Sequence, residues 1–180
     1  KSIEELPHGD LLINVKFSSL NYKDALSASG NKGITREYPH TPGIDATGIV
    51  ELSNDSEFSE GTYVIVNGYD LGMNTSGGFG EYIRVPSSWA VPVPSDFSKE
   101  QIMGLGCAGL TAGLSVKALQ ENSIINQKSV LVSGATGGVG SIAVKLLSHL
   151  GANVTAVTEK SKKSKYLEKI GAKNILSRDE

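Results

Sequence analysis

Three glycines recur at a spacing that suits phosphate binding. Gly134, Gly137 and Gly140 follow a compact apolar segment at 129–133 and precede a segment with helical periodicity. Glycines let the backbone turn tightly and approach a pyrophosphate, and the start of the following helix presents free N–H groups and a partial positive charge. The pattern therefore predicts a nucleotide-binding loop, with a plain turn as the alternative.

The next predicted strand covers 153–157. The residues that follow it indicate which dinucleotide the loop would bind. An acidic side chain there accepts hydrogen bonds from a free ribose 2′-hydroxyl, whereas hydroxyl and cationic side chains suit a 2′-phosphate. The sequence at this point is Thr158, Glu159 and Lys160. Thr158 and Lys160 favour NADP(H), and Glu159 is the residue that favours NAD(H).

The elements around the loop alternate between strand and helix. Predicted strands at 129–133, 153–157 and 174–176 are separated by two helices, of which the second ends near residue 170. This order predicts parallel strands joined by right-handed crossovers, as in one mononucleotide-binding half of a doubly wound sheet. The first helix has one apolar face, made by Val139, Ile142, Ala143, Leu146, Leu147 and Leu150.

The first half of the chain is predicted to be a β domain. Four short segments rich in β-branched and aromatic residues lie at 11–17, 48–52, 62–66 and 81–85, separated by Gly, Pro, Asn, Asp and Ser. One short helix is expected over 22–27. Many short strands at irregular spacing favour a barrel or a sandwich.

A proline-rich segment marks the predicted boundary between the two domains. The two prolines within 90–96 prevent it from continuing a central strand, because proline lacks a backbone donor. Ser98 and Gln101 then have the spacing of a capping box at the start of an apolar helix. Residues 1–97 are therefore assigned to the β domain, and 98–180 to an incomplete dinucleotide-binding domain.

Composition and charge exclude several classes of protein. The 180 residues are 39% hydrophobic and 20% charged, which is typical of a globular protein. A net charge of −2 argues against nucleic acid as a partner. The single cysteine, Cys107, excludes an internal disulfide and fits the cytoplasm. The longest uncharged apolar stretch, 102–116, is too short and too rich in glycine for a membrane span, and a chain that begins at Lys1 is expected to start inside a longer gene product.

Four motifs resemble one branch of an enzyme superfamily. They are Ser-Ser-Leu-Asn-Tyr-Lys-Asp-Ala-Leu at 18–26, Pro-Gly-Ile-Asp at 42–45, Gly-Gly-Phe-Gly-Glu at 77–81 and Ser-Gly-Ala-Thr-Gly-Gly-Val-Gly at 133–140. In this order they resemble the medium-chain dehydrogenase/reductases, and more narrowly the zinc-free YhdH/YhfP branch of quinone oxidoreductases and acryloyl-CoA reductases. The resemblance implies a GroES-like β-barrel domain followed by the first half of a Rossmann domain, in a chain truncated at both ends. It also implies NADP(H) as the cofactor and a homodimer.

The resemblance implies roles for individual residues as well. Tyr22 is expected beside the nicotinamide, where its phenol either protonates the product or orients a thioester carbonyl, or else only packs on the ring. Thr111 is expected near the nicotinamide or bonded to its own helix backbone, and Asn21 either donates to substrate or caps the short helix. Where the branch has Ser-Gly-Arg, Lys160 keeps the cationic charge while Glu159 replaces the glycine. The implied cofactor-binding residues are Tyr22, Thr111, Gly134, Thr136, Gly137, Gly138, Val139, Thr158, Glu159 and Lys160.

The positions that hold zinc in the metal-dependent relatives do not suit a metal in this chain. Those relatives carry Gly-His-Glu where this chain has Gly-Ile-Asp at 43–45, and a cysteine where it has Asn21. Ile44 cannot ligate a metal, and the histidines and Cys107 show no ligand spacing, so no metal site is predicted. Hydride addition to an electron-poor alkene or quinone suits such a site, because the acceptor's own conjugation spreads the charge that a metal would otherwise stabilise.

The resulting hypothesis is a cytoplasmic NADPH-dependent reductase of the activated double bond in an enoyl thioester such as acryloyl-CoA. The prediction of a thioester substrate depends on the resemblance alone, and small quinones are the alternative acceptors. Two hypotheses from other classes stay open: an NADPH-binding sensor or structural protein without catalysis, and a scaffold that binds no dinucleotide. Neither nucleic acid nor a membrane is an expected partner.

Overall fold

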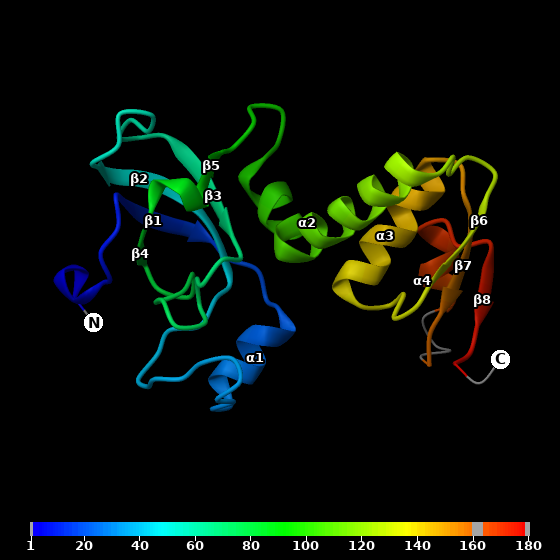
Figure 1. Ribbon diagram of the computed structural model, residues 1–180, viewed down its shortest axis with the longest axis horizontal. Helices are drawn as coiled ribbons and strands as arrows, with labels where there is room; N and C mark the ends of the chain where they lie inside the picture. Colours follow the sequence, from blue (N-terminus) through cyan, green and yellow to red (C-terminus); the bar gives the residue numbers. More distant parts are fainter. Residues whose placement is uncertain (1, 160–163, 179–180) are drawn as a thin grey trace. The chain divides into compact units, whose positions relative to one another are not determined.

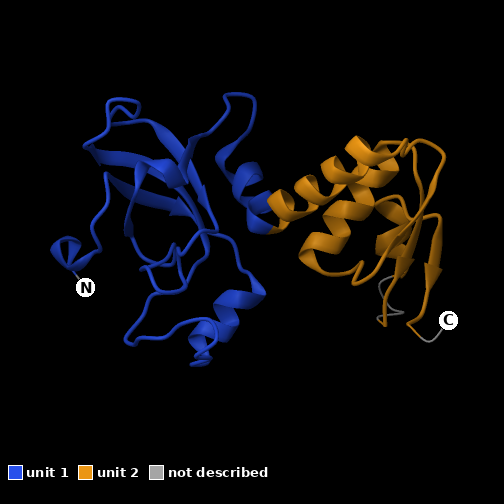
Figure 2. Cartoon of the chain, in the orientation of Figure 1, with its two compact units in different colours: residues 1–107 blue, residues 108–180 orange. Residues whose placement is uncertain are grey.

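The computed structural model describes residues 2–159 and 164–178 of the chain. The chain divides into two compact units, Lys1–Cys107 and Ala108–Glu180 (Figure 2). The division falls inside one long helix, α2 (Lys99–Asn122). Each unit contains its own sheet and its own hydrophobic core.

The first unit is built on a five-stranded antiparallel sheet with the strand order β4-β1-β2-β3-β5 (Figure 1). The register places Ile13 of β1 opposite Val50 of β2 and Ile83 of β4. All three side chains are buried in the core of this unit, so each of these strands presents an apolar face to it. The strands are β1 (Leu11–Phe17), β2 (Asp45–Ser53), β3 (Tyr63–Asn67), β4 (Tyr82–Val85) and β5 (Ala90–Pro92).

The four predicted strands and the short helix of this unit are confirmed, the helix as α1 (Tyr22–Ala28). The structure adds β5, a strand in the segment where the prolines predict a break. β5 lies at the edge of the sheet, where Pro92 pairs with Val64 and its missing donor is tolerated. Two short 3-10 turns, η1 (Ile3–Glu5) and η2 (Ser87–Trp89), also belong to this unit.

The second unit contains three parallel strands in the order β6-β7-β8, with helices between them (Figure 1). This arrangement confirms the predicted order of strands and helices in half of a doubly wound sheet. Its core includes Val154 of the predicted strand and Leu147 of the predicted apolar helix face. The predicted face is wrong in part: Val144, which it leaves out, is completely buried, and Val139, which it includes, is 40% exposed. The elements are β6 (Ser129–Val132), α3 (Gly138–His149), β7 (Asn153–Val157), α4 (Ser164–Lys169) and β8 (Asn174–Leu176).

Helix α2 begins at the predicted capping box and is interrupted within its first third. The Ser98 N–H donates to Gln101 Oε1 at 3.0 Å, and the Gln101 N–H donates to Ser98 Oγ at 3.2 Å. Gly106 has non-helical angles, φ 49° and ψ −151°. By length and composition alone α2 is a candidate membrane span, with a mean hydropathy of 1.5. The interruption leaves two stretches, 99–105 and 107–122, each shorter than the ~20 residues that a span requires.

Candidate functional site

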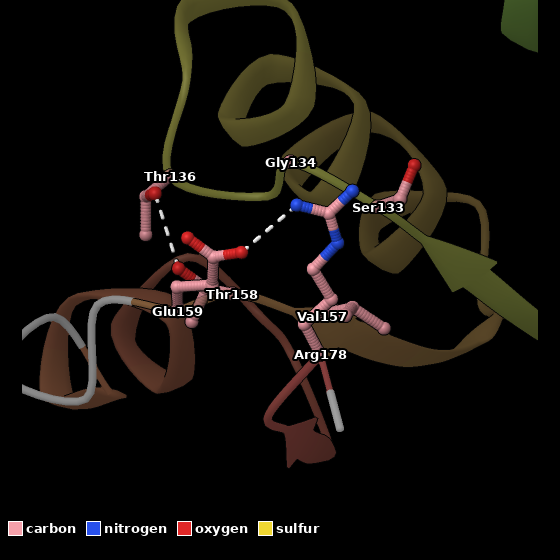
Figure 3. A pocket seen from close by; sticks show the side chains of 7 residues that line it. All are labelled: Ser133, Gly134, Thr136, Val157, Thr158, Glu159 and Arg178. Carbon is pink, nitrogen blue, oxygen red and sulfur yellow. Dashed lines mark hydrogen bonds and ion pairs between the residues drawn. The ribbon is translucent and has the colours of Figure 1, made fainter. Parts of the chain in front are cut away.

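A pocket of about 400 Å³ opens where β6 and β7 end in the second unit (Figure 3). In open sheets of this kind, ligands bind beyond the carboxyl ends of the strands. The pocket joins the end of β6, the glycine-rich loop, the end of β7 and a residue that follows β8. Its lining residues are Ser133, Gly134, Thr136, Val157, Thr158, Glu159 and Arg178.

The glycine-rich loop folds into a tight turn that starts α3. The Gly137 N–H donates to the carbonyl of Gly134 at 2.9 Å, and the Ala135 N–H donates to the carbonyl of Val157 at 3.2 Å, which ties the loop to β7. Gly137 is the N-cap of α3, so the N–H groups of the first turn, from Gly138 onward, have no acceptor within the helix. Gly138 and Val139 are exposed, and an anion at the start of this helix would accept hydrogen bonds from their N–H groups.

The third glycine of the motif has a different purpose from the first two. Gly140 is buried on α3, and a Cβ at this position would collide with the carbonyl of Gly134. Its absence lets α3 pack directly against the loop that precedes it. The structure therefore contains the close approach of helix and loop that the glycine spacing predicts.

Two threonines connect the loop with the end of β7. The hydroxyls of Thr136 and Thr158 share a hydrogen bond of 3.2 Å (Figure 3). Thr158 is 8% exposed, and its N–H donates to the carbonyl of Leu176 in β8 at 3.1 Å. The backbone at the end of β7 is thereby fixed at the floor of the pocket, with Glu159 next in sequence.

The pocket also contains a cation that the sequence motifs do not reveal. Arg178 Nη1 lies 2.9 Å from Glu159 Oε1, and both side chains are largely exposed (Figure 3). An exposed pair of this kind contributes at most about 1 kcal/mol to stability. The position of the pair matters more than its stability, because the Arg178 guanidinium binds the carboxylate of Glu159, the residue that favours NAD(H). Arg178 is two residues beyond β8, and the rule that parallel strands end at one edge of the sheet is the signal that finds it.

The other predicted cofactor residues lie in different parts of the chain. Lys160 lies outside the described residues. Thr111 is exposed on α2 in the second unit. Tyr22 belongs to the first unit, where it is the first residue of α1 and 79% exposed.

Asn21 is engaged within the first unit. It forms a capping box with Asp24, and its amide Nδ2 donates to Asp45 Oδ2 at 3.1 Å and to Ser19 Oγ at 3.1 Å. Asn21 therefore belongs to the start of α1, and a contact of Asn21 with substrate stays a prediction. Among residues 2–159 and 164–178, no three His, Cys, Asp or Glu side chains gather where they could hold a metal ion.

The residues of the pocket fit a dinucleotide. The turn at the start of α3 leaves space where Cβ atoms would otherwise stand, the exposed N–H groups suit a pyrophosphate, and Arg178 supplies a cation beside Thr158. All three features lie along one edge of the β6-β7-β8 sheet.

Comparison with known proteins agrees with this description. Residues 7–95 match the family model of the alcohol dehydrogenase GroES-like domain. The putative quinone oxidoreductase YhfP of Bacillus subtilis is 46% identical over 99% of this chain and 54% of its own length. The acrylyl-CoA reductase AcuI of Ruegeria pomeroyi is 41% identical, with the same coverage. The chain therefore spans about half the length of the curated relatives that it matches.

Solved structures extend the likeness to both units. The yhdH oxidoreductase of Salmonella enterica, in complex with NADP, is 44% identical and has a TM-score of 0.96 over 99% of this chain and 56% of its own. The Bacillus subtilis yhfP structure, with NAD bound, has 45% identity and a TM-score of 0.91 over 99% and 55% of the two chains. Similar proteins have thus been crystallised with each of the two dinucleotides.

Proposed function

The chain belongs to the medium-chain dehydrogenase/reductase superfamily, and from this premise we propose that the protein is an NADPH-dependent oxidoreductase. The observation that carries the proposal is the pocket at the ends of β6 and β7, where an exposed helix start, two threonines and Arg178 converge. The Salmonella relative in complex with NADP supports the same cofactor.

Different residues of the second unit bind the pyrophosphate and the 2′-phosphate of the cofactor. The loop from Thr136 to Val139 holds the pyrophosphate through backbone N–H groups, and Gly140 lets the helix start approach closely. Thr158 and Arg178, which line the pocket, receive the 2′-phosphate. Lys160 is assigned to the same phosphate from the family resemblance alone. When bound, NADPH supplies a hydride from C4 of its nicotinamide.

The preference for NADPH follows from the balance of charge in the pocket. Glu159 alone would favour the free 2′-hydroxyl of NAD(H), but its carboxylate is paired with Arg178. A 2′-phosphate would compete with this carboxylate for the guanidinium and bring more negative charge to it.

We assign the acceptor to the activated C=C bond of an α,β-unsaturated thioester such as acryloyl-CoA. The 41% identical acrylyl-CoA reductase supports this class. The hydride adds to the β-carbon, the electron pair of the double bond moves toward the thioester carbonyl, and the α-carbon then takes a proton. Ile44 is buried and carries no ligand atom, so the chain's own part is to position the acceptor and deliver the proton.

Tyr22 is the proposed proton donor. Its exposed phenol stands at the first residue of α1, and a phenol can donate. Tyr22→Phe is expected to lower kcat by about 100-fold, the lower end of general acid catalysis, and to leave KM for NADPH within about twofold. Steady-state kinetics on the full-length protein measure both. Tyr69→Phe, which removes another exposed phenol of the first unit, is the control. Wild-type turnover in Tyr22→Phe would leave Tyr22 only a packing role.

A comparison of acceptors tests the proposed function. We expect NADPH oxidation with acryloyl-CoA to exceed that with crotonyl-CoA and with benzoquinone in kcat/KM. The quinone oxidoreductase name of the Bacillus relative makes quinone reduction the second candidate, and benzoquinone as the preferred acceptor would establish it. NADPH binding without turnover of any acceptor would instead indicate a sensor or structural protein. The cytoplasmic location, which the single cysteine predicts, and the homodimer, which the family resemblance implies, both stay predictions.

A further inference from the structure

Asp45 is a completely buried carboxylate at the start of β2, with 0% of its surface exposed. Its Oδ1 accepts the N–H of Ser19 at 2.8 Å, and its Oδ2 accepts the Ser19 hydroxyl at 2.6 Å. Oδ2 also accepts the amide of Asn21 at 3.1 Å and the N–H of Cys107 at 3.0 Å. A buried carboxylate is costly unless donors surround it, and these four donors supply that environment.

The donors come from two segments far apart in the sequence. Ser19 and Asn21 lie in the turn before α1, and Cys107 is the first residue after the break in α2. A Cβ at Gly106 would lie 2.6 Å from Asp45 Oδ2, so only glycine lets the carboxylate reach the N–H of Cys107. Asp45 thereby caps the start of the helical stretch 107–122, where a negative charge is favourable.

A second buried carboxylate holds the same turn from its other side. Asp24 is 3% exposed, and its Oδ2 accepts the N–H of Asn21 at 2.7 Å. Its Oδ1 accepts the N–H groups of Gly43 and Ile44, at 3.1 and 2.9 Å. The residue directly before Tyr22 is therefore held through its backbone by Asp24 and through its side chain by Asp45.

We infer that Asp45 is a positioning residue for the proposed reduction, fixing the turn that presents Tyr22. The inference rests on the proposed function, since it assumes that Tyr22 faces the reacting groups. Asp45 itself needs no contact with substrate. Its effect passes through Asn21 on one side and the N–H of Cys107 on the other.

Asp45→Asn is the direct test in the full-length protein. The amide keeps the size of the side chain but turns an NH₂ toward donors, so at least one of the four hydrogen bonds is lost. We expect kcat for the acceptor to fall by about 10- to 100-fold, with the Kd for NADPH within about twofold because its phosphate groups bind in the second unit. Asp96→Asn, at an exposed acidic residue of the same unit, is the matched control and should keep wild-type kcat.

The pKa of the Cys107 thiol gives a test of the role of Asp45 that does not require enzyme turnover. The pKa of Cys107 is raised to about 11, chiefly by burial and also by the negative charges of Asp45 and Asp24, against the opposing effect of the Gly68 N–H. Without the Asp45 charge, the pKa of Cys107 should fall but stay above its ordinary value, since burial persists. The pH dependence of iodoacetamide labelling, followed by mass spectrometry of the Cys107 peptide, measures this. A return to the ordinary pKa would show that the region has opened, and would overturn the inference.

A second variant keeps the inference testable if Asp45→Asn does not fold. Ser19→Ala removes one hydroxyl donor and leaves the carboxylate, so kcat should fall in the same direction by a smaller factor. Wild-type kcat in either folded variant would overturn the inference and leave the proposed function standing. If the wild-type protein reduces no acceptor, the proposed function fails instead. In that case the labelling of Cys107 is the only test of the role of Asp45. An unchanged pKa of Cys107 in Asp45→Asn would overturn that role.

Discussion

Arg178→Ala is expected to raise the Kd for NADPH by about 10- to 100-fold while the Kd for NADH stays within about twofold. The guanidinium lies in the pocket 2.9 Å from Glu159, beside the end of β7. A charge-assisted hydrogen bond to a phosphate contributes about 1.5–3 kcal/mol, which is the source of this factor. Titration of each dinucleotide by its fluorescence measures the two constants.

Glu159→Gln is the matched variant for this prediction, because it removes the opposing charge from the same pair. It should tighten NADPH and weaken NADH, since the free guanidinium gains a phosphate partner and the ribose 2′-hydroxyl loses its acceptor. Lys160→Ala should weaken NADPH in the same direction as Arg178→Ala. An unchanged ratio of the two Kd values in Arg178→Ala would exclude Arg178 from the 2′-phosphate site.

Gly140→Val should abolish measurable binding of both dinucleotides. A side chain at this buried position meets the carbonyl of Gly134, so either the loop or the start of α3 must move. Overpacking of this kind costs about 1–3 kcal/mol of stability, and the displaced N–H groups no longer converge on a pyrophosphate. Fluorescence titration and thermal unfolding of the full-length protein measure the two effects.

Gly113→Ala is the control for this substitution. Gly113 lies in α2 of the same unit, and nothing stands within 4 Å of a Cβ added there. Alanine should therefore stabilise the protein by about 0.5–1 kcal/mol, through its better helix propensity. If Gly140→Val bound NADPH as the wild type does, the glycine-rich loop would not be the pyrophosphate site.

The periodicities of the sequence predict most of the fold. Each strand of the β6-β7-β8 sheet and α3 follow from apolar spacing and from the glycines that end them, because these signals are local. β5 was not predicted, since its prolines exclude a central strand but not an edge strand. That distinction depends on where a strand lies in the sheet, which local sequence does not contain.

The candidate site likewise contains residues that the sequence predicts and residues that it does not. The loop at 134–140 and the residues after β7 could be predicted, because each lies next to its own element in the chain. Arg178 was missed because it meets Glu159 only when two parallel strands end side by side, 19 residues apart in sequence. Asp45 is part of the motif at 42–45, but its contact with Cys107 could not be predicted, because the two residues are 62 positions apart in the sequence.

Hydride transfer itself is the central claim, and an isotope measurement tests it most directly. The full-length protein is mixed with acryloyl-CoA and NADPH that carries deuterium on the transferred C4 position, and the product is analysed by mass spectrometry and NMR. The account predicts propionyl-CoA with one deuterium on the β-carbon and a solvent proton on the α-carbon. NADPH that binds but is not consumed, or a product without deuterium on the β-carbon, would contradict it.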